Sequence, residues 1–315
     1  MDIKRVVIFG HKPAEGRNAL GMKKKPHTHS YIHGGYFRGF QALGYETHWL
    51  DASSPEISEF PTTGTLFFTE DQADERIPLS KDAFYITHSS SKTKYEEVGA
   101  ARLNLCNYVS DLVTGESFNY PGERVERIDE VSFVDARSKA LYQPWATNLL
   151  PSEIDSSDLI SFDASKSTVN YVGTIGHDNI KPRYKQFASS AAKNGVNVKL
   201  HFGVSDDQAR TLIRESRLSV DIRGDWHLQR GYIPCRIWKN LSYGMHVGSN
   251  SLLLRDVFEE KVTFEADPGE LFNACNAAFA NTPDDVRRQT MMWIKERHTF
   301  VNRATRSIEI LRQLH

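Results

Sequence analysis

Short apolar runs alternate with helix-sized segments along this chain. The first run, RVVIFG at 5–10, is rich in β-branched residues and ends in glycine, which is typical of the first strand of an α/β domain. Large apolar residues between Tyr36 and Leu43 recur at helical spacing and predict a helix over 30–44. Further strands are expected at 46–51, 65–69, 83–87, 103–109 and 130–134. This alternation predicts a mostly parallel sheet with helices on its faces.

A segment rich in serine and aspartate interrupts the pattern at 151–168, and we interpret it as a linker. Strands are then expected at 169–173, 196–203, 218–222 and 262–264, and helices at 181–194, 205–216, 268–280 and 284–314, the last broken near 298–302. The chain therefore predicts two α/β domains, residues 1–150 and 169–285, followed by a C-terminal helical segment, residues 286–315.

Composition narrows the possible classes of protein. The 315 residues are 39% hydrophobic and 25% charged with a net charge of −1, so nothing suggests a general attraction to nucleic acid or membrane. No apolar run approaches the roughly 20 residues of a transmembrane helix, and the N-terminal run is too short for a signal sequence. Three widely separated cysteines fit a reducing compartment. We expect a cytoplasmic protein without a transmembrane segment and without a nucleic-acid partner.

The stretch 231–251 predicts a short helix followed by a buried strand. Arg236, Lys239 and Asn240 fall on one side of this helix and apolar residues on the other. Two cations and an amide near a helix N-terminus favour binding of a phosphate group. The alternative is an amphipathic surface helix with a solvated basic face.

In α/β domains, ligands bind at the loops that follow the carboxyl ends of the strands. In the second half these loops hold cations and groups that can approach a phosphate or stack on a sugar or base: Gly173, Thr174, Arg223, Arg230 and Tyr232. In the first half they hold imidazoles: His27, His29, His33 and His88. This division suits an anionic donor that binds in the second half and an acceptor that is deprotonated in the first half.

The histidine cluster is the strongest candidate for catalysis, because imidazole has a pKa suited to a general base. His33 is favoured since it abuts Gly34 and Gly35 at the start of the expected helix, followed by His29; Asp111 is a weaker candidate. Two alternatives stay open. One is that the His-x-His spacing with a third histidine binds zinc, although no acidic or cysteine ligand lies nearby in the sequence. The other is that the segment is a polar loop that happens to hold three histidines.

Several segments resemble one enzyme family. HGGYFRGFQALGYETHWLD at 33–51 resembles the opening of the first helix in GT-B glycosyltransferases, and 231–250 resembles their donor-site helix. ERHTFVNRATRSIEI at 296–310 and YQPWATNLL at 142–150 are similar to the spore-maturation CgeB-like branch. The resemblance implies two Rossmann-like domains facing a central cleft, with a C-terminal helix that crosses back to the N-terminal domain. It also implies a nucleotide-sugar donor held by the second domain, an acceptor held by the first, and no required metal or other cofactor.

Lys239 departs from this pattern. Many family members carry a carboxylate at this position to bind ribose, and a lysine donates hydrogen bonds but accepts none. Either the ribose is bound by another group or Lys239 binds a phosphate. The sequence also lacks an Asp-x-Asp between apolar strand residues, which a metal-dependent transferase of the other common fold would need.

We therefore expect a metal-independent GT-B glycosyltransferase that moves a sugar from a nucleotide-diphosphate sugar to a hydroxyl of a glycan or another sugar. A nucleotide-sugar epimerase on the same fold and a non-catalytic sugar-nucleotide or glycan-binding protein are the alternatives. The sequence leaves open the base, the sugar (hexose, pentose or deoxyhexose), the acceptor, the stereochemistry and the oligomeric state.

Overall fold

The structure is a computed structural model that describes residues 2–12, 28–51, 53–70, 75–88, 94–106, 125–176, 179–229 and 232–315. The chain divides into two compact units. The first contains Met1–Leu150 together with Phe300–His315, and the second contains Pro151–Thr299. The C-terminal helix thus belongs to the first unit, whereas residues 286–299, which the sequence pattern groups with it, belong to the second.

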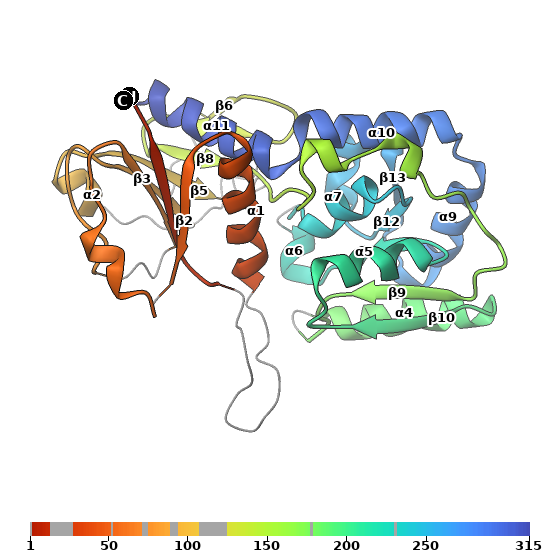
Figure 1. The fold of residues 1–315 in the computed structure, drawn as a ribbon. Coiled ribbons are helices and arrows are strands. Elements are labelled where there is room, and N and C mark those ends of the chain that lie inside the picture. The colour runs from red at the N-terminus through yellow and green to blue at the C-terminus, as the bar shows by residue number, and fades with distance from the viewer. Residues whose placement is uncertain are drawn as a thin grey trace. The chain divides into compact units, whose positions relative to one another are not determined.

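The first unit is built on a mixed sheet (Figure 1). Its strand order is β2-β1-β3-β4-β5-β8-β7-β6, and β2 to β8 in this order run parallel. The strands are β1 (Arg5–Phe9), β2 (Glu46–Leu50), β3 (Thr65–Glu70), β4 (Phe84–His88), β5 (Ala101–Cys106), β6 (Val125–Arg127), β7 (Phe133–Asp135) and β8 (Ala140–Tyr142). The first four predicted strands are confirmed. The strand expected at 130–134 is wrong in its bounds, because residues 128–132 form a turn in which Ile128 N–H donates to Ser132 O, and the antiparallel β7 begins at Phe133.

This strand order fixes where a ligand is expected in the first unit. The chain passes from β1 to β2 on one side, and then returns to place β3 on the other side of β1. The crossovers therefore leave β1 and β3 in opposite directions, and ligands of open α/β sheets bind at this switch point, beyond the carboxyl ends of the strands. In this unit those ends are Phe9 and Glu70.

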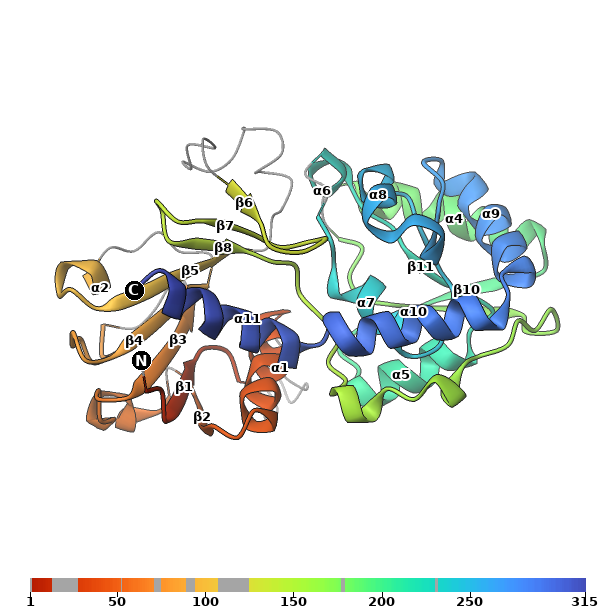
Figure 2. The same ribbon diagram turned by 90° about the horizontal axis from the view of Figure 1, so that it is seen from above.

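Glycines bring the two long helices of the first unit together. The helices are α1 (Thr28–Ala42), α2 (Lys94–Glu97) and α11 (Phe300–Gln313), with a 3₁₀ turn η1 (Pro55–Glu59). α11 packs beside α1 (Figures 1 and 2). A Cβ atom on Gly35 would lie 2.2 Å from Cδ2 of Phe300, and one on Gly39 would lie 2.8 Å from its carbonyl oxygen. Only glycine permits this approach, so these positions fix the docking of the C-terminal helix.

The second unit has two parallel sheets. One pairs β9 (Thr168–Val172) with β10 (Asn197–His201), and the other has the order β11 (Ser219–Asp221), β12 (Val247–Ser249), β13 (Val262–Phe264). β11 lies beside β9, and the Tyr171 hydroxyl donates to Ile222 O across this boundary at 3.3 Å. The helices are α4 (Ile180–Lys193), α5 (Asp206–Glu215), α6 (Asp225–Gln229), α7 (Cys235–Ser242), α8 (Arg255–Phe258), α9 (Pro268–Asn281) and α10 (Asp284–Arg297), with 3₁₀ turns η2 (Pro151–Glu153), η3 (Ser156–Asp158), η4 (Leu252–Leu254) and η5 (Glu259–Lys261). β10 lies on one side of β9 and β11 on the other, so the second unit has its own switch point between β9 and β11.

Two connections between these elements bear on the sequence predictions. The expected break in the last helix is confirmed, since α10 ends at Arg297 and α11 begins at Phe300. The buried ring of His298 fills this break and stacks on Trp238, with ring centroids 4.2 Å apart.

The expected linker is held to the second unit by side chains, including Arg214 Nη1, which donates to Asp158 O at 2.8 Å. Within the described part of the chain, no helix has the length and apolar character needed to cross a membrane.

Candidate functional site

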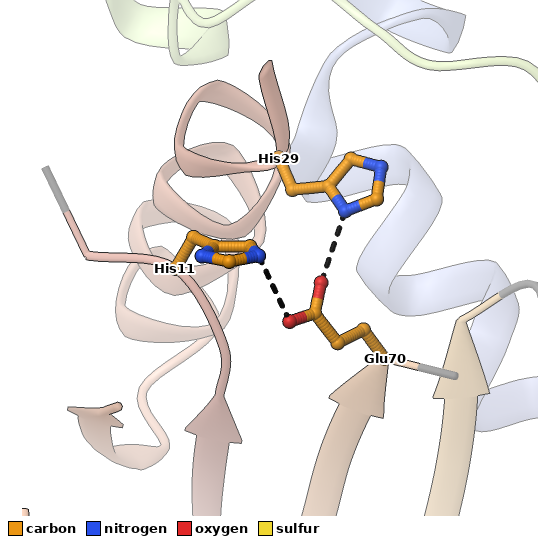
Figure 3. A group of neighbouring side chains, drawn as sticks. All are labelled: His11, His29 and Glu70. Atoms are coloured by element: carbon orange, nitrogen blue, oxygen red, sulfur yellow. Dashed lines mark hydrogen bonds and ion pairs between the residues drawn. The ribbon is translucent and has the colours of Figure 1, made fainter. Parts of the chain in front are cut away.

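Three side chains meet at the switch point of the first unit. His11 follows β1, His29 lies in the first turn of α1, and Glu70 is the last residue of β3. Nδ1 of His29 lies 2.9 Å from Oε2 of Glu70, and Nε2 of His11 lies 3.2 Å from Oε1 (Figure 3). One carboxylate therefore holds two imidazoles, one through each oxygen.

The protonation of Glu70 determines the tautomer of His29. Partial burial would raise the pKa of Glu70, but the hydrogen bond from His29 and the electrostatic effect of the neighbouring imidazoles of His33, His11 and His29 outweigh it and lower the pKa. An ionised carboxylate only accepts hydrogen bonds, so the proton that joins His29 to Glu70 resides on Nδ1 of His29. In the neutral ring this leaves the lone pair on Nε2, which points away from Glu70 (Figure 3). A carboxylate that fixes the tautomer of a histidine in this way prepares it to accept a proton.

Two further histidines are buried behind His29. The side chains of His33 and His88 are 0% and 2% exposed, whereas that of His29 is 34% exposed. The ring of His33 packs directly against Gly10, where a Cβ atom would lie 2.3 Å from Cε1. Burial, together with the neighbouring His33 and His29, holds the pKa of His88 well below its usual range, so His88 is neutral near pH 7. The sequence favoured His33 as the general base, but in the structure His33 is buried and His29 is partly exposed, so His29 is the better candidate.

The remaining candidates of the first half lie elsewhere. Gly34 and Gly35 are inside α1, where they face the ring of Trp49 and the ring of Phe300. His27 and Asp111 fall outside the described residues.

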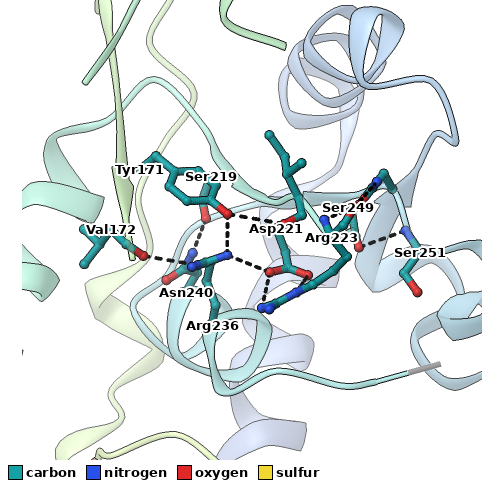
Figure 4. Close-up of polar contacts among 11 residues, drawn as sticks. Tyr171, Val172, Ser219, Asp221, Arg223, Arg236, Asn240, Ser249 and Ser251 are labelled. Atoms are coloured by element: carbon teal, nitrogen blue, oxygen red, sulfur yellow. Dashed lines mark hydrogen bonds and ion pairs between the residues drawn. The ribbon is translucent and has the colours of Figure 1, made fainter. Parts of the chain in front are cut away.

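A second charged cluster lies at the switch point of the second unit. Asp221, at the end of β11, has a fully buried side chain. Nε of Arg223 lies 2.8 Å from its Oδ2, and Nη1 of Arg236 lies 2.9 Å from its Oδ1 (Figure 4). Arg236 also donates to the Tyr171 hydroxyl at 2.7 Å and to Val172 O at 3.2 Å. These bonds hold the guanidinium across the ends of β9 and β11.

The cluster carries a net positive charge. Burial would raise the pKa of Asp221, but the two arginines outweigh it and lower the pKa, so the carboxylate stays ionised. Two cations and one anion leave a formal charge of +1. A surplus of one positive charge at the carboxyl edge of a parallel sheet favours an anionic ligand.

Two other predicted residues join this cluster. Gly173 has φ = +139°, and a Cβ atom there would lie 2.1 Å from Nη2 of Arg236. The Tyr232 ring centroid lies 5.4 Å from the Arg223 guanidinium carbon. Thr174 follows Gly173 and is exposed. Gly173 thus leaves the room that the Arg236 side chain occupies, whereas the sequence favoured a ligand that approaches the backbone there.

The other predicted residues of 231–251 separate from the cluster. Nζ of Lys239 lies 3.4 Å from Oδ1 of Asp206. Asn240 is buried and donates to the Ser219 hydroxyl. Arg230, which precedes this stretch, lies outside the described residues.

Sequence reasoning missed the two carboxylates, Glu70 and Asp221. Glu70 directly follows the strand predicted at 65–69, and Asp221 is the penultimate residue of the strand predicted at 218–222. A charged residue near the carboxyl end of an apolar strand is the signal that was available. What each one contacts depends on strand order, which the sequence pattern does not specify.

Comparison with known proteins gives a fold but no family. No family model and no curated protein matches the sequence. A conserved domain protein from Vibrio cholerae aligns over 90% of this chain and 86% of its own chain with 10% identity, but its TM-score of 0.23 is too low to indicate a shared fold. A glycosyltransferase from Rickettsia africae aligns over 100% of this chain and 99% of its own, with a TM-score of 0.51 and 9% identity. The chain thus shares the overall α/β fold of that glycosyltransferase.

Proposed function

We propose that this protein is a GT-B glycosyltransferase that moves a sugar from a nucleotide-diphosphate sugar to a hydroxyl of a glycan or other sugar acceptor. The observation that carries the proposal is the His29–Glu70 pair, a carboxylate-oriented imidazole at the switch point of the first sheet. The fold shared with the Rickettsia africae glycosyltransferase supports it.

In this proposal His29 is the general base. Its Nε2 takes the proton of the acceptor hydroxyl as that oxygen attacks the anomeric carbon of the donor. Glu70 keeps the opposite proton on Nδ1 and stabilises the imidazolium that forms. His33 and His88 hold the position of the His29 ring by packing, with ring centroids 5.9 Å and 4.8 Å from it.

The second unit would bind the donor. Arg236 and Arg223 would stabilise the negative charge that develops on the leaving diphosphate, so that no metal ion is needed for this step. Asp221 acts as a positioning residue, because it holds both guanidinium groups in place. Thr174 and the ring of Tyr232 would contact the nucleotide or the sugar.

A donor panel tests the proposal. Thermal shift with UDP, GDP and dTDP identifies the nucleotide, since a ligand at 100 times its Kd adds about 2.7 kcal/mol of stability. Product analysis with the matching nucleotide-sugar, in excess EDTA and with sugar acceptors, then measures transfer and the anomeric configuration of the product.

We expect transfer in EDTA that requires both donor and acceptor, and loss of nucleotide binding in Arg236→Gln. Conversion of the donor sugar without an acceptor would instead establish the epimerase. Nucleotide binding without turnover across the acceptor panel would establish the binding protein.

A further inference from the structure

The cluster of His11, His29 and Glu70 brings together two imidazoles and one carboxylate from three separate parts of the chain. One ring nitrogen of His11, one ring nitrogen of His29 and a carboxylate oxygen of Glu70 all lie within 4.8 Å of one another. The zinc alternative considered from the sequence included His29 but neither His11 nor Glu70, because Glu70 is far from the histidines along the chain and reaches them through the pairing of β1 with β3.

We propose that His11, His29 and Glu70 form a binding site for a divalent zinc-class metal ion, and that metal bound there switches off His29 as the base. The inhibition of His29 rests on the proposed function, while the metal site does not depend on it.

The distances suit a tetrahedral ion. In a zinc site with bonds of about 2.0–2.1 Å, neighbouring ligand atoms lie roughly 3.3 Å apart. Glu70 oxygens already lie 2.9 Å from Nδ1 of His29 and 3.2 Å from Nε2 of His11. The two nitrogens are at most 4.8 Å apart, and rotation of the His11 side chain, which is 45% exposed, would close the difference.

The ligand set selects the class of metal. Two imidazoles and one carboxylate suit zinc and its neighbours in the first transition row, whereas calcium and magnesium prefer oxygen ligands alone. Three protein ligands leave a fourth position for water, as in zinc sites that remain open to ligands.

Metal binding would reverse the tautomer of His29. Without metal, Nδ1 carries the proton that Glu70 accepts, and Nε2 carries the lone pair. A metal bound to Nδ1 takes the lone pair of that nitrogen, so the single proton of the neutral ring moves to Nε2. Nε2 then has no lone pair to accept the proton of an acceptor hydroxyl. The His11 ring changes in the opposite sense, with its proton on Nδ1, so no net proton is gained or lost.

Titration calorimetry of tag-free protein with Zn²⁺ tests the site itself, and Co²⁺ serves as a spectroscopic probe of tetrahedral geometry. The test variants are His11→Gln and Glu70→Gln. The matched control is His48→Gln, which removes an imidazole that lies 2.8 Å from Glu46 in the same unit, where Arg5 also binds the carboxylate. Circular dichroism confirms the fold of each variant.

We expect one tight zinc site per chain, a Kd raised at least about 10-fold in both test variants, and no change in the control. Nitrogen chemical shifts of the imidazoles should report metal on Nδ1 of His29. Equal affinity in wild type and His11→Gln, or an equal loss in His48→Gln, would overturn the site.

The inhibitory half has a separate readout. Zinc should inhibit transfer by wild type, and His11→Gln should need at least about 10-fold more zinc for the same fractional loss of its own metal-free rate. Zinc binding without inhibition would overturn the switch and leave the site standing. Zinc binding by a protein that transfers no sugar would refute the proposed function, and would not affect the binding site.

Discussion

Replacement of Asp221 by asparagine tests how the donor cluster is held together. The fully buried carboxylate has Nε of Arg223 at 2.8 Å and Nη1 of Arg236 at 2.9 Å. With an effective dielectric constant of about 20, Coulomb's law gives roughly 6 kcal/mol of gross attraction for each contact. The cost of removing the charges from water offsets most of this gain. Removal of one partner from a buried ion pair nevertheless costs about 3–5 kcal/mol, because it leaves the other charge uncompensated.

Asp221→Asn keeps the shape of the side chain and leaves two guanidinium groups together without a counter-charge. We expect it to lower the free energy of unfolding of the second unit by about 3–5 kcal/mol. The matched control is Asp206→Asn, since Asp206 is half-exposed and pairs with Lys239 at 3.4 Å. An exposed pair of this kind contributes at most about 1 kcal/mol.

Urea unfolding followed by tryptophan fluorescence measures both variants. The rings of Trp238 and Trp293 lie 5.5 Å apart in the second unit and report on its unfolding. With a slope of about 3 kcal/mol per molar urea, the expected loss moves the midpoint down by at least about 1 M. If Asp221→Asn costs no more than Asp206→Asn, the two arginines do not depend on the buried carboxylate, and the account of the donor cluster fails.

Three further predictions concern single positions. Burial and the nearby Arg287 lower the pKa of His246 to about 4, so the folded protein binds this proton less readily than the unfolded chain and stability falls as the pH drops from 6.5 towards 4. The loss from this group is roughly 3 kcal/mol, and the melting temperature of His246→Gln should fall less steeply over the same range than that of wild type. Gly35→Ala places a methyl group against the Phe300 ring and should cost about 1–3 kcal/mol in urea unfolding, whereas Gly44→Ala, at φ = +85° but with open space around it, should bring backbone strain alone. Gly173→Ala should displace Arg236 and raise the Kd for the nucleotide diphosphate at least about 10-fold by calorimetry, and unchanged binding would separate Arg236 from the phosphate.

Local pattern was sufficient for most of the fold. Apolar runs located β1 to β4, and the break between α10 and α11 was predicted near His298. Gly244, at φ = +81°, follows α7 and closes it in the left-handed conformation that glycine adopts readily. The short strands β6 and β8 escaped prediction and β7 was predicted with the wrong bounds, because strands of three residues carry little periodicity.

The candidate sites were predicted only in part, for a physical reason. The sequence identified the cations and imidazoles by residue type, but their partners Glu70 and Asp221 reach them through strand order. α7 shows the same limit. Its amphipathic pattern placed Asn240 on a polar face, yet β11 and α10 cover this helix from different sides and Asn240 is buried against Ser219. Periodicity describes one buried face, and a helix covered on several sides has more than one.

The most direct test of the central claim is the rate of sugar transfer by His29→Gln, measured in EDTA with the donor that the nucleotide panel identifies. His48→Gln, which loses an imidazole from a pair outside the site, is the control. Loss of a general base predicts a rate about 10²–10⁴-fold below wild type for His29→Gln, with the control at the wild-type rate. Equal rates in His29→Gln and wild type would contradict the assignment of His29 as the base that the Glu70 carboxylate prepares.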